Sequence, residues 1–187
     1  DISLKWIKDA GGKVDNLLCK GSLKHCEKQL RKTPAEHLAD IKNTIAIADE
    51  MGIEVNVYLE DWSNGMVDSP EYVYQIIEGL SDTTVTRIML PDTLGILNHR
   101  DTGKYCADMV TRFPNMKFDY HAHNDYDLST ANAFEAIKSG VHCIHTTLNG
   151  LGERAGNVPL SSVIGIVKDH LKLDMNVDEK KLYKVSK

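Results

Sequence analysis

Two histidines, His121 and His123, stand two positions apart in the segment FDYHAHND. On a β-strand, side chains two positions apart point to the same face of the sheet, so we expect both imidazoles to point the same way. Such a pair can bind one metal ion, and nitrogen and oxygen ligands without a thiolate suit Zn²⁺, Mn²⁺ or Mg²⁺. Because two histidines do not complete a metal site, we expect oxygen ligands from elsewhere in the protein. The alternative interpretation is a structural or surface role for both side chains.

A glycine-rich stretch, TTLNGLGERAGN at residues 146–157, follows after one helix-length segment. It is typical of a strand that runs into a tight turn. Glycine adopts positive φ without strain and lets a backbone approach a ligand closely, so Gly150, Gly152 and Gly156 predict a ligand-binding loop. The alternative is an ordinary turn before a helix.

Two further polar residues follow expected strands. Glu60 comes after the strand-like run IEVNVYL, and a partly shielded carboxylate at such a place can act as a general acid or base. A solvated loop carboxylate is the commoner case for a lone glutamate. Thr93 follows the run IMLPD, where it can bind a substrate carboxylate or cap the loop after it. The remaining histidines are interpreted as loop, structural or solvated residues: His25, His37, His99, His142, His145 and His170.

Strands and helices are expected to alternate along the whole chain. Residues 33–36 form a capping box, with Thr33 as the cap, Pro34 in the first helical position and Glu36 three residues after the cap. We expect strands at 14–19, 53–59, 85–90, 117–121 and 141–148. We expect helices at 34–51, 69–80, 100–113, 130–139 and 159–171. Five successive βα units predict an α/β fold with a parallel sheet, either a barrel or a doubly wound sheet.

The position of the unusual polar residues favours the barrel. They all follow the carboxyl ends of expected strands: Glu60, Asp61, Asp92, Thr93, His121, His123 and residues 149–157. Barrel enzymes build their sites from many strand ends, whereas a doubly wound sheet concentrates its site at one switch point. We therefore expect a partial (β/α)8 barrel.

Composition excludes several other classes of function. The 187 residues carry a net charge of −5, without a basic stripe that would favour nucleic acid or an anionic membrane. No apolar run approaches the roughly 20 residues of a membrane span. The four cysteines form no CxxC pair, which favours a reducing, cytoplasmic location. The first residues read as the end of a helix, which favours a fragment of a longer protein.

Three motifs together resemble one enzyme family. LPDTLG, HAHND and TTLNGLGERAGN are similar to motifs of the α-isopropylmalate, citramalate and homocitrate synthases, within the metal-dependent aldolase/lyase barrels. The resemblance covers about residues 13–171 and implies that the fourth to eighth βα units are present. The family's Asp-Arg-Glu motif of the first strand is absent. We expect a partial catalytic domain at 1–172 and the start of a helical accessory region at 173–187.

The resemblance also implies roles for the chemistry-bearing residues. His121 and His123 match the family's metal-ligating histidines, and Asn157 matches a residue at or near the metal. Glu60 matches the catalytic carboxylate near the acetyl-CoA methyl group, and Glu153 lies among the residues of the catalytic region. On the substrate side, the implied residues are Thr93 for the acceptor carboxylate, His25, Tyr58 and Leu18 for the acceptor side chain, and Gly150, Gly152 and Gly156 for acetyl-CoA.

The function implied by the resemblance is a Claisen-type condensation of acetyl-CoA with a 2-oxo acid, assisted by Mg²⁺, Mn²⁺ or Zn²⁺. A bulky Tyr58 favours pyruvate, and hence a citramalate synthase, but one methylene group is worth only about 1–3 kcal/mol, so 2-oxoisovalerate and an isopropylmalate synthase stay open. An acyl-CoA lyase is a weaker match, because Glu153 and Arg154 stand where the lyase loop carries a reactive cysteine. A metal-binding remnant without activity and an unrelated barrel hydrolase also stay open. We expect a homodimer.

Overall fold

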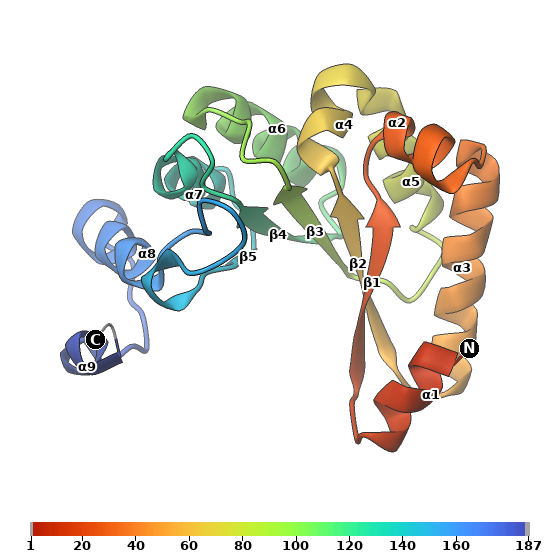
Figure 1. Cartoon of the computed structure of the whole chain (residues 1–187), viewed down its shortest axis with the longest axis horizontal. Coiled ribbons are helices and arrows are strands. Elements are labelled where there is room, and N and C mark those ends of the chain that lie inside the picture. The colour runs from red at the N-terminus through yellow and green to blue at the C-terminus, as the bar shows by residue number, and fades with distance from the viewer. Residues whose placement is uncertain (1, 186–187) are drawn as a thin grey trace. The chain divides into compact units, whose positions relative to one another are not determined.

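The structure is a computed structural model that describes residues 2–185, without the side chain of residue 183, and strands and helices alternate in it as expected (Figure 1). The strands are β1 (Val14–Lys20), β2 (Glu54–Glu60), β3 (Arg87–Asp92), β4 (Lys117–Ala122) and β5 (Cys143–Ile144). The α-helices are α1 (Ile2–Asp9), α2 (Leu23–His25), α3 (Pro34–Glu50), α4 (Trp62–Asp68), α5 (Pro70–Gly79), α6 (His99–Arg112), α7 (Ser129–Lys138), α8 (Leu160–Ile166) and α9 (Leu182–Val185). Short 3-10 and π-helical turns are η1 (Cys26–Leu30), η2 (Leu148–Gly150), η3 (Val167–Leu171) and η4 (Glu179–Lys181).

The five strands form one sheet in the order β1-β2-β3-β4-β5. The pairs β1–β2, β2–β3 and β4–β5 are parallel. Strand order therefore follows chain order without the reversal that a doubly wound sheet requires at its switch point. The predicted α/β class and the partial barrel agree with this topology.

The chain divides into two compact units. The first comprises residues 1–91 and 114–118, and the second comprises residues 92–113 and 119–187. Buried apolar side chains of the first unit include Ile41, Ile45, Val57, Leu59, Ile76, Ile77, Ile88 and Leu90. Those of the second include Leu97, Cys106, Met109, Tyr120, Ala133, Ala136 and Val158. Each unit therefore has its own apolar core.

Strand alternation decides which side chains of the first unit can form a site. Val57 and Leu59 are fully buried on one face of β2, and α3 packs against this strand (Figure 1). Tyr58 and Glu60 point to the opposite face and are partly exposed. Since β1 and β2 are parallel and in register, their residues on this opposite face stand side by side as cross-strand pairs.

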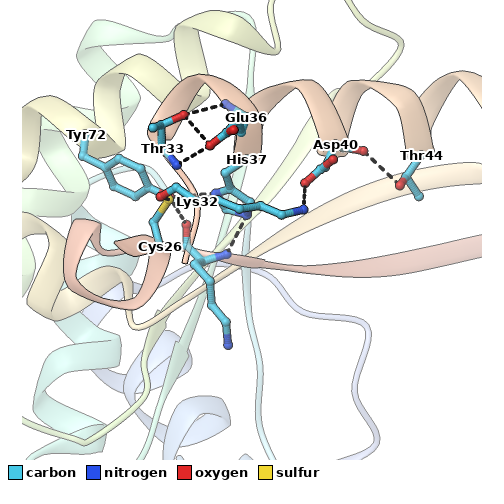
Figure 2. Close-up of polar contacts among 9 residues, drawn as sticks. Cys26, Lys32, Thr33, Glu36, His37, Asp40, Thr44 and Tyr72 are labelled. Atoms are coloured by element: carbon cyan, nitrogen blue, oxygen red, sulfur yellow. Dashed lines mark hydrogen bonds and ion pairs between the residues drawn. The ribbon is translucent and has the colours of Figure 1, made fainter. Parts of the chain in front are cut away.

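The predicted capping box is present at the start of α3. Thr33 Oγ1 accepts a hydrogen bond from the Glu36 backbone N–H at 3.3 Å, and Glu36 Oε2 accepts one from the Thr33 backbone N–H at 2.8 Å (Figure 2). Pro34 occupies the first helical position as expected. At the other end, Gly52 follows the helix with a φ of +71°, which a residue with a side chain adopts only under strain. Both ends of this helix are thus encoded locally.

Two elements differ from the expectation. The strand expected at 141–148 is reduced to Cys143–Ile144, and beyond it the Thr147 backbone N–H donates to the carbonyl of Val158 at 3.1 Å rather than to β4. Helix α4 was not predicted, and it begins after Asp61, which has a φ of +67°. Its Trp62 is fully buried, so packing rather than local propensity supports this short helix.

Residues 172–178 have no regular secondary structure, η4 and α9 follow at Glu179–Lys181 and Leu182–Val185, and residues 186 and 187 of the expected further helix lie outside the described part. No helix within residues 2–185 has the length and apolar character needed to cross a membrane. The division at residue 172 stays a prediction.

Candidate functional site

The second unit brings His121 and His123 together at the end of β4. Their Nε2 atoms are 3.4 Å apart, and the ring centroids are 5.1 Å apart at an interplanar angle of 78°. The two side chains thus point to one place, as strand alternation predicts. His123 lies just beyond β4 and forms an isolated antiparallel bridge with Asn157.

The glycine-rich loop folds back onto these histidines. Asn157 is 6% exposed, and its Nδ2 lies 3.3 Å from Nε2 of His121. Gly152 makes this approach possible, since a Cβ atom there would stand 1.6 Å from Oδ1 of Asn157. Gly156 has a φ of +95°, and a Cβ atom there would stand 2.2 Å from the carbonyl oxygen of Gly150. The loop therefore needs glycine at both positions to hold its amide beside the imidazoles.

Burial keeps both imidazoles neutral at pH 7. Burial, followed by the neighbouring His123 and His145, lowers the pKa of His121 to about 4. Burial and then the Arg154 guanidinium lower the pKa of His123. A neutral imidazole offers a nitrogen lone pair, which is the form that binds a metal.

These residues fit part of a divalent-metal site. Two neutral imidazoles converge on one place, and rotation of the Asn157 amide would exchange its nitrogen for an oxygen ligand. Nδ1 of His123 is buried and has no hydrogen-bond partner among the described residues. Within residues 2–185, no group of three or more His, Cys, Asp or Glu side chains is arranged to hold a metal. Further ligands would therefore be required.

His145 was missed by the sequence interpretation, which took it as structural or solvated. Its ring centroid lies 5.6 Å from that of His121, and its Nε2 lies 3.6 Å from Oδ2 of the buried Asp119. The register Tyr120↔Ile144, continued by one residue, places His145 beside His121. The signal was available in the run HCIHTT, since alternation from the expected strand puts this histidine at the carboxyl end with the other two.

Arg154 lies in the glycine-rich loop and bonds to the two segments that follow β3 and β4. Its Nε and Nη2 donate to the two carboxylate oxygens of Asp125 at 2.7 and 2.8 Å, and Nη2 donates to the Thr93 carbonyl at 2.8 Å. The guanidinium lowers the pKa of the Asp125 carboxyl. Glu153 is exposed on the loop, and its carboxylate lies 3.8 Å from the same guanidinium. The loop is thereby tied to the segments that carry Thr93 and His123.

The first unit carries the remaining predicted site residues. Leu18 pairs with Tyr58, and Lys20 pairs with Glu60, in the register of β1 and β2. Leu18 is 60% exposed, and Tyr58 and Glu60 are partly exposed. The Lys20 ammonium and the Glu60 carboxylate form an ion pair.

His25 also lies at this end of the strand pair, in α2, rather than in a solvated loop. Its Nε2 is 3.4 Å from Oδ2 of Asp61, the residue directly after Glu60. Asp61 is 1% exposed and accepts hydrogen bonds from Ser22 Oγ and Asn64 Nδ2, both at 2.7 Å. Asp61 thus anchors His25 at the end of β2.

The predicted site residues therefore divide between the two units. The first unit holds Leu18, His25, Tyr58 and Glu60, and the second holds Thr93, His121, His123, Glu153, Asn157 and the three loop glycines, Gly150, Gly152 and Gly156. The structure brings His121, His123 and Asn157 together and pairs Leu18 with Tyr58, while the chemical roles of all these residues stay predictions.

A family profile and two curated relatives match most of this chain. A family profile described as HMGL-like matches residues 8–187. The homocitrate synthase of Sulfolobus acidocaldarius is 36% identical over 162 residues, which cover 87% of this chain and 34% of that protein. The homocitrate synthase of Sulfurisphaera tokodaii is 36% identical over 151 residues, which cover 81% of this chain and 32% of that protein. The chain thus spans about a third of the length of these curated relatives.

Solved structures show the same fold at lower identity. The hydroxymethylglutaryl-CoA lyase of Pseudomonas aeruginosa superposes with a TM-score of 0.82 and 19% identity over 99% of this chain and 64% of that chain. The HMG-CoA lyase of Brucella melitensis gives a TM-score of 0.80 and 16% identity over 98% of this chain and 68% of that chain.

Proposed function

Because the chain belongs to the HMGL-like family of metal-dependent aldolase/lyase barrel enzymes, we propose that the whole protein condenses acetyl-CoA with a 2-oxo acid. The product would be a 2-alkylmalate, either 2-isopropylmalate or citramalate. The observation that carries the proposal is the pair of neutral imidazoles, 3.4 Å apart at Nε2, with the Asn157 amide beside His121.

The residues of the chain suggest how they would serve this reaction. His121, His123 and Asn157 would hold a divalent metal, which when bound supplies Lewis-acid polarisation of the acceptor carbonyl. Glu60 would take a proton from the methyl group of acetyl-CoA, as a carboxylate at a partly shielded strand end can do. Thr93 would bind the acceptor carboxylate, and the backbone of the glycine-rich loop would lie on the acetyl-CoA side. Glu153 would act in the same region.

The cross-strand pair Leu18–Tyr58 supports a small apolar acceptor. Neither side chain offers a cation for a second carboxylate, and the adjacent Lys20 is paired with Glu60. We therefore propose pyruvate or 2-oxoisovalerate as the acceptor. Since the curated relatives are homocitrate synthases, 2-oxoglutarate, which carries a second carboxylate, is the comparison that tests this preference.

Release of CoA from acetyl-CoA, followed with a thiol reagent in the full-length protein, tests the proposal. We expect turnover with pyruvate or 2-oxoisovalerate that EDTA abolishes and a divalent metal restores. A His123→Ala variant should lose at least about 100-fold in kcat, because it removes a proposed metal ligand.

Three outcomes would count against parts of the proposal. Preference for 2-oxoglutarate would contradict the apolar acceptor but leave the condensation standing. Cleavage of hydroxymethylglutaryl-CoA without condensation would favour a lyase. Metal binding without turnover of any of these acceptors would favour a non-catalytic protein.

A further inference from the structure

The face of the β1–β2 pair that carries the proposed catalytic carboxylate holds three matched cross-strand pairs. Asn16 faces Asn56, whose Nδ2 donates to Oδ1 of Asn16 at 3.0 Å. The next pair is Leu18–Tyr58, and the last pair, at the carboxyl end, is Lys20–Glu60. The face thus presents an amide pair, an apolar pair and an ion pair in succession.

The ion pair is not an ordinary surface contact. The Lys20 and Glu60 side chains are 16% and 28% exposed, whereas those of Lys42 and Asp82, another Lys–carboxylate pair of the same unit, are 35% and 68% exposed. Partial withdrawal from water strengthens the attraction between the charges and reduces screening by salt. Lys20 and Glu60 are forty residues apart in sequence, so the strand register rather than local sequence places them together.

A buried network fixes the backbone of Lys20. Its N–H donates to Nε2 of His37 at 3.4 Å, and its carbonyl accepts from the Tyr72 hydroxyl at 3.0 Å. Nδ1 of His37 lies 2.8 Å from the Tyr72 hydroxyl oxygen (Figure 2). Since Nε2 accepts from Lys20 and the Tyr72 hydroxyl donates to Lys20, Nδ1 carries the proton and donates to Tyr72.

This ring of three hydrogen bonds requires a neutral His37 buried at 4% exposure, beside a Tyr72 of equal exposure. The backbone of Lys20 is therefore held on both sides of its Cα atom, at the N–H and at the carbonyl, by buried side chains that do not move freely. A rigid backbone gives the flexible lysine stem a fixed origin from which to reach Glu60.

We propose that Lys20 is a positioning residue that holds the Glu60 carboxylate in one orientation for proton abstraction. The inference rests on the proposed function, in which Glu60 is the base. The ammonium binds one carboxylate oxygen, which limits the rotamers of Glu60 and leaves the second oxygen to meet the substrate methyl group. Lys20 itself touches no reacting atom in this scheme.

Replacement of Lys20 in the full-length protein tests the proposal. In Lys20→Met, which keeps the length of the stem and removes the charge, we expect kcat to fall about 10–100-fold, since a misplaced catalytic group costs on that order. The KM for the 2-oxo acid should change less than about threefold, because Glu60 is assigned to acetyl-CoA. Lys20→Arg restores a cation and should recover most of kcat.

The matched control is Lys42→Met, which removes the exposed Lys42–Asp82 pair and should leave both constants unchanged. When Lys20→Met is added to Glu60→Gln, the residual single-turnover rate should not fall further, because the carboxylate that Lys20 positions is already absent. An equal loss in both backgrounds would overturn the proposal. So would a failure of Lys20→Arg to recover activity while Lys20→Met and Lys20→Arg fold equally well.

A second readout does not depend on turnover. A double-mutant cycle of Lys20→Met and Glu60→Gln on the free energy of unfolding should show coupling between the two residues, and a cycle of Lys20→Met with Asp82→Asn should not. Absence of coupling overturns the inference even in an active enzyme. Coupling in a protein that turns over none of the 2-oxo acids would retain the Lys20–Glu60 contact and count against the proposed function instead.

Discussion

At the scale of single residues, Arg154 ties the glycine-rich loop to the segments that follow β3 and β4. It forms two parallel hydrogen bonds to Asp125, a geometry that a planar guanidinium provides and a lysine ammonium does not. The same side chain donates to the Thr93 carbonyl. An exposed pair of this kind contributes little to global stability, so its value lies in fixing the loop relative to His123, two positions before Asp125.

We therefore expect Arg154→Lys to weaken metal binding about 10-fold, in the range found for groups that orient metal ligands, with little change in the free energy of unfolding of the metal-free protein. Isothermal titration with Mn²⁺ or Zn²⁺ measures the metal affinity, and urea unfolding in EDTA measures the free energy of unfolding.

Arg112→Lys is the matched control, since the Arg112–Asp108 ion pair lies along α6, with its closest nitrogen and oxygen 3.8 Å apart. Equal metal affinity in Arg154→Lys and Arg112→Lys would contradict a role of Arg154 in the loop.

At the scale of elements, the glycine-rich loop depends on a close contact that one methyl group would destroy. A Cβ atom at Gly152 would overlap Oδ1 of Asn157, so Asn157 or the loop backbone has to move in Gly152→Ala. Because the loop is held mainly by its own hydrogen bonds, the displacement should stay local.

We expect Gly152→Ala to weaken metal binding at least about 10-fold while secondary structure by circular dichroism stays unchanged. Gly165→Ala in α8 is the matched control, since nothing lies within 4 Å of the added Cβ atom. That control should stabilise the protein by about 0.5–1 kcal/mol, the difference in helix propensity. Unaltered metal affinity in Gly152→Ala would show that Asn157 is not held by this contact.

At the scale of the whole molecule, buried and half-buried neutral histidines couple folding to pH. Burial lowers the pKa of His37, His121 and His123 below the ordinary value of 6.5. Below pH 6.5 these histidines bind more protons in the unfolded chain than in the folded chain. The contribution of the three neutral histidines to stability is therefore complete above about pH 6.5 and is lost as the pH falls towards the folded-state pKa. For His121 this window extends down to about pH 4.

We expect the free energy of unfolding, measured in EDTA, to decrease as the pH is lowered from 6.5 to 4. In His121→Asn this decrease should be smaller by about 1–3 kcal/mol. Burial raises the pKa of Asp15, which acts in the opposite direction in this range, so the difference between variant and parent is the quantity to compare. Identical pH profiles for the two proteins would contradict the half-buried, neutral state of His121. The homodimer stays a prediction at this scale.

Local sequence determined the features that depend on neighbouring residues. The capping box of Thr33 and Glu36 follows from a spacing of three residues, and the common direction of His121 and His123 follows from strand alternation. Five βα units in series determined the parallel sheet, because short connections place successive strands beside each other. Backbone geometry over a few residues is enough for each of these predictions.

The tertiary structure decided the features that depend on register and packing. Three contacts join residues from separate segments: the Lys20–Glu60 ion pair, the ring contact of His145 with His121, and the Arg154–Asp125 ion pair. The extent of β5 was also decided there, since Thr147 bonds to the Val158 carbonyl within the loop. Strand alternation could have placed His145 at the same sheet edge as His121, but spacing along the sequence does not determine the other two contacts, because the free energy of a pairing depends on which groups the whole fold brings within reach and shields from water.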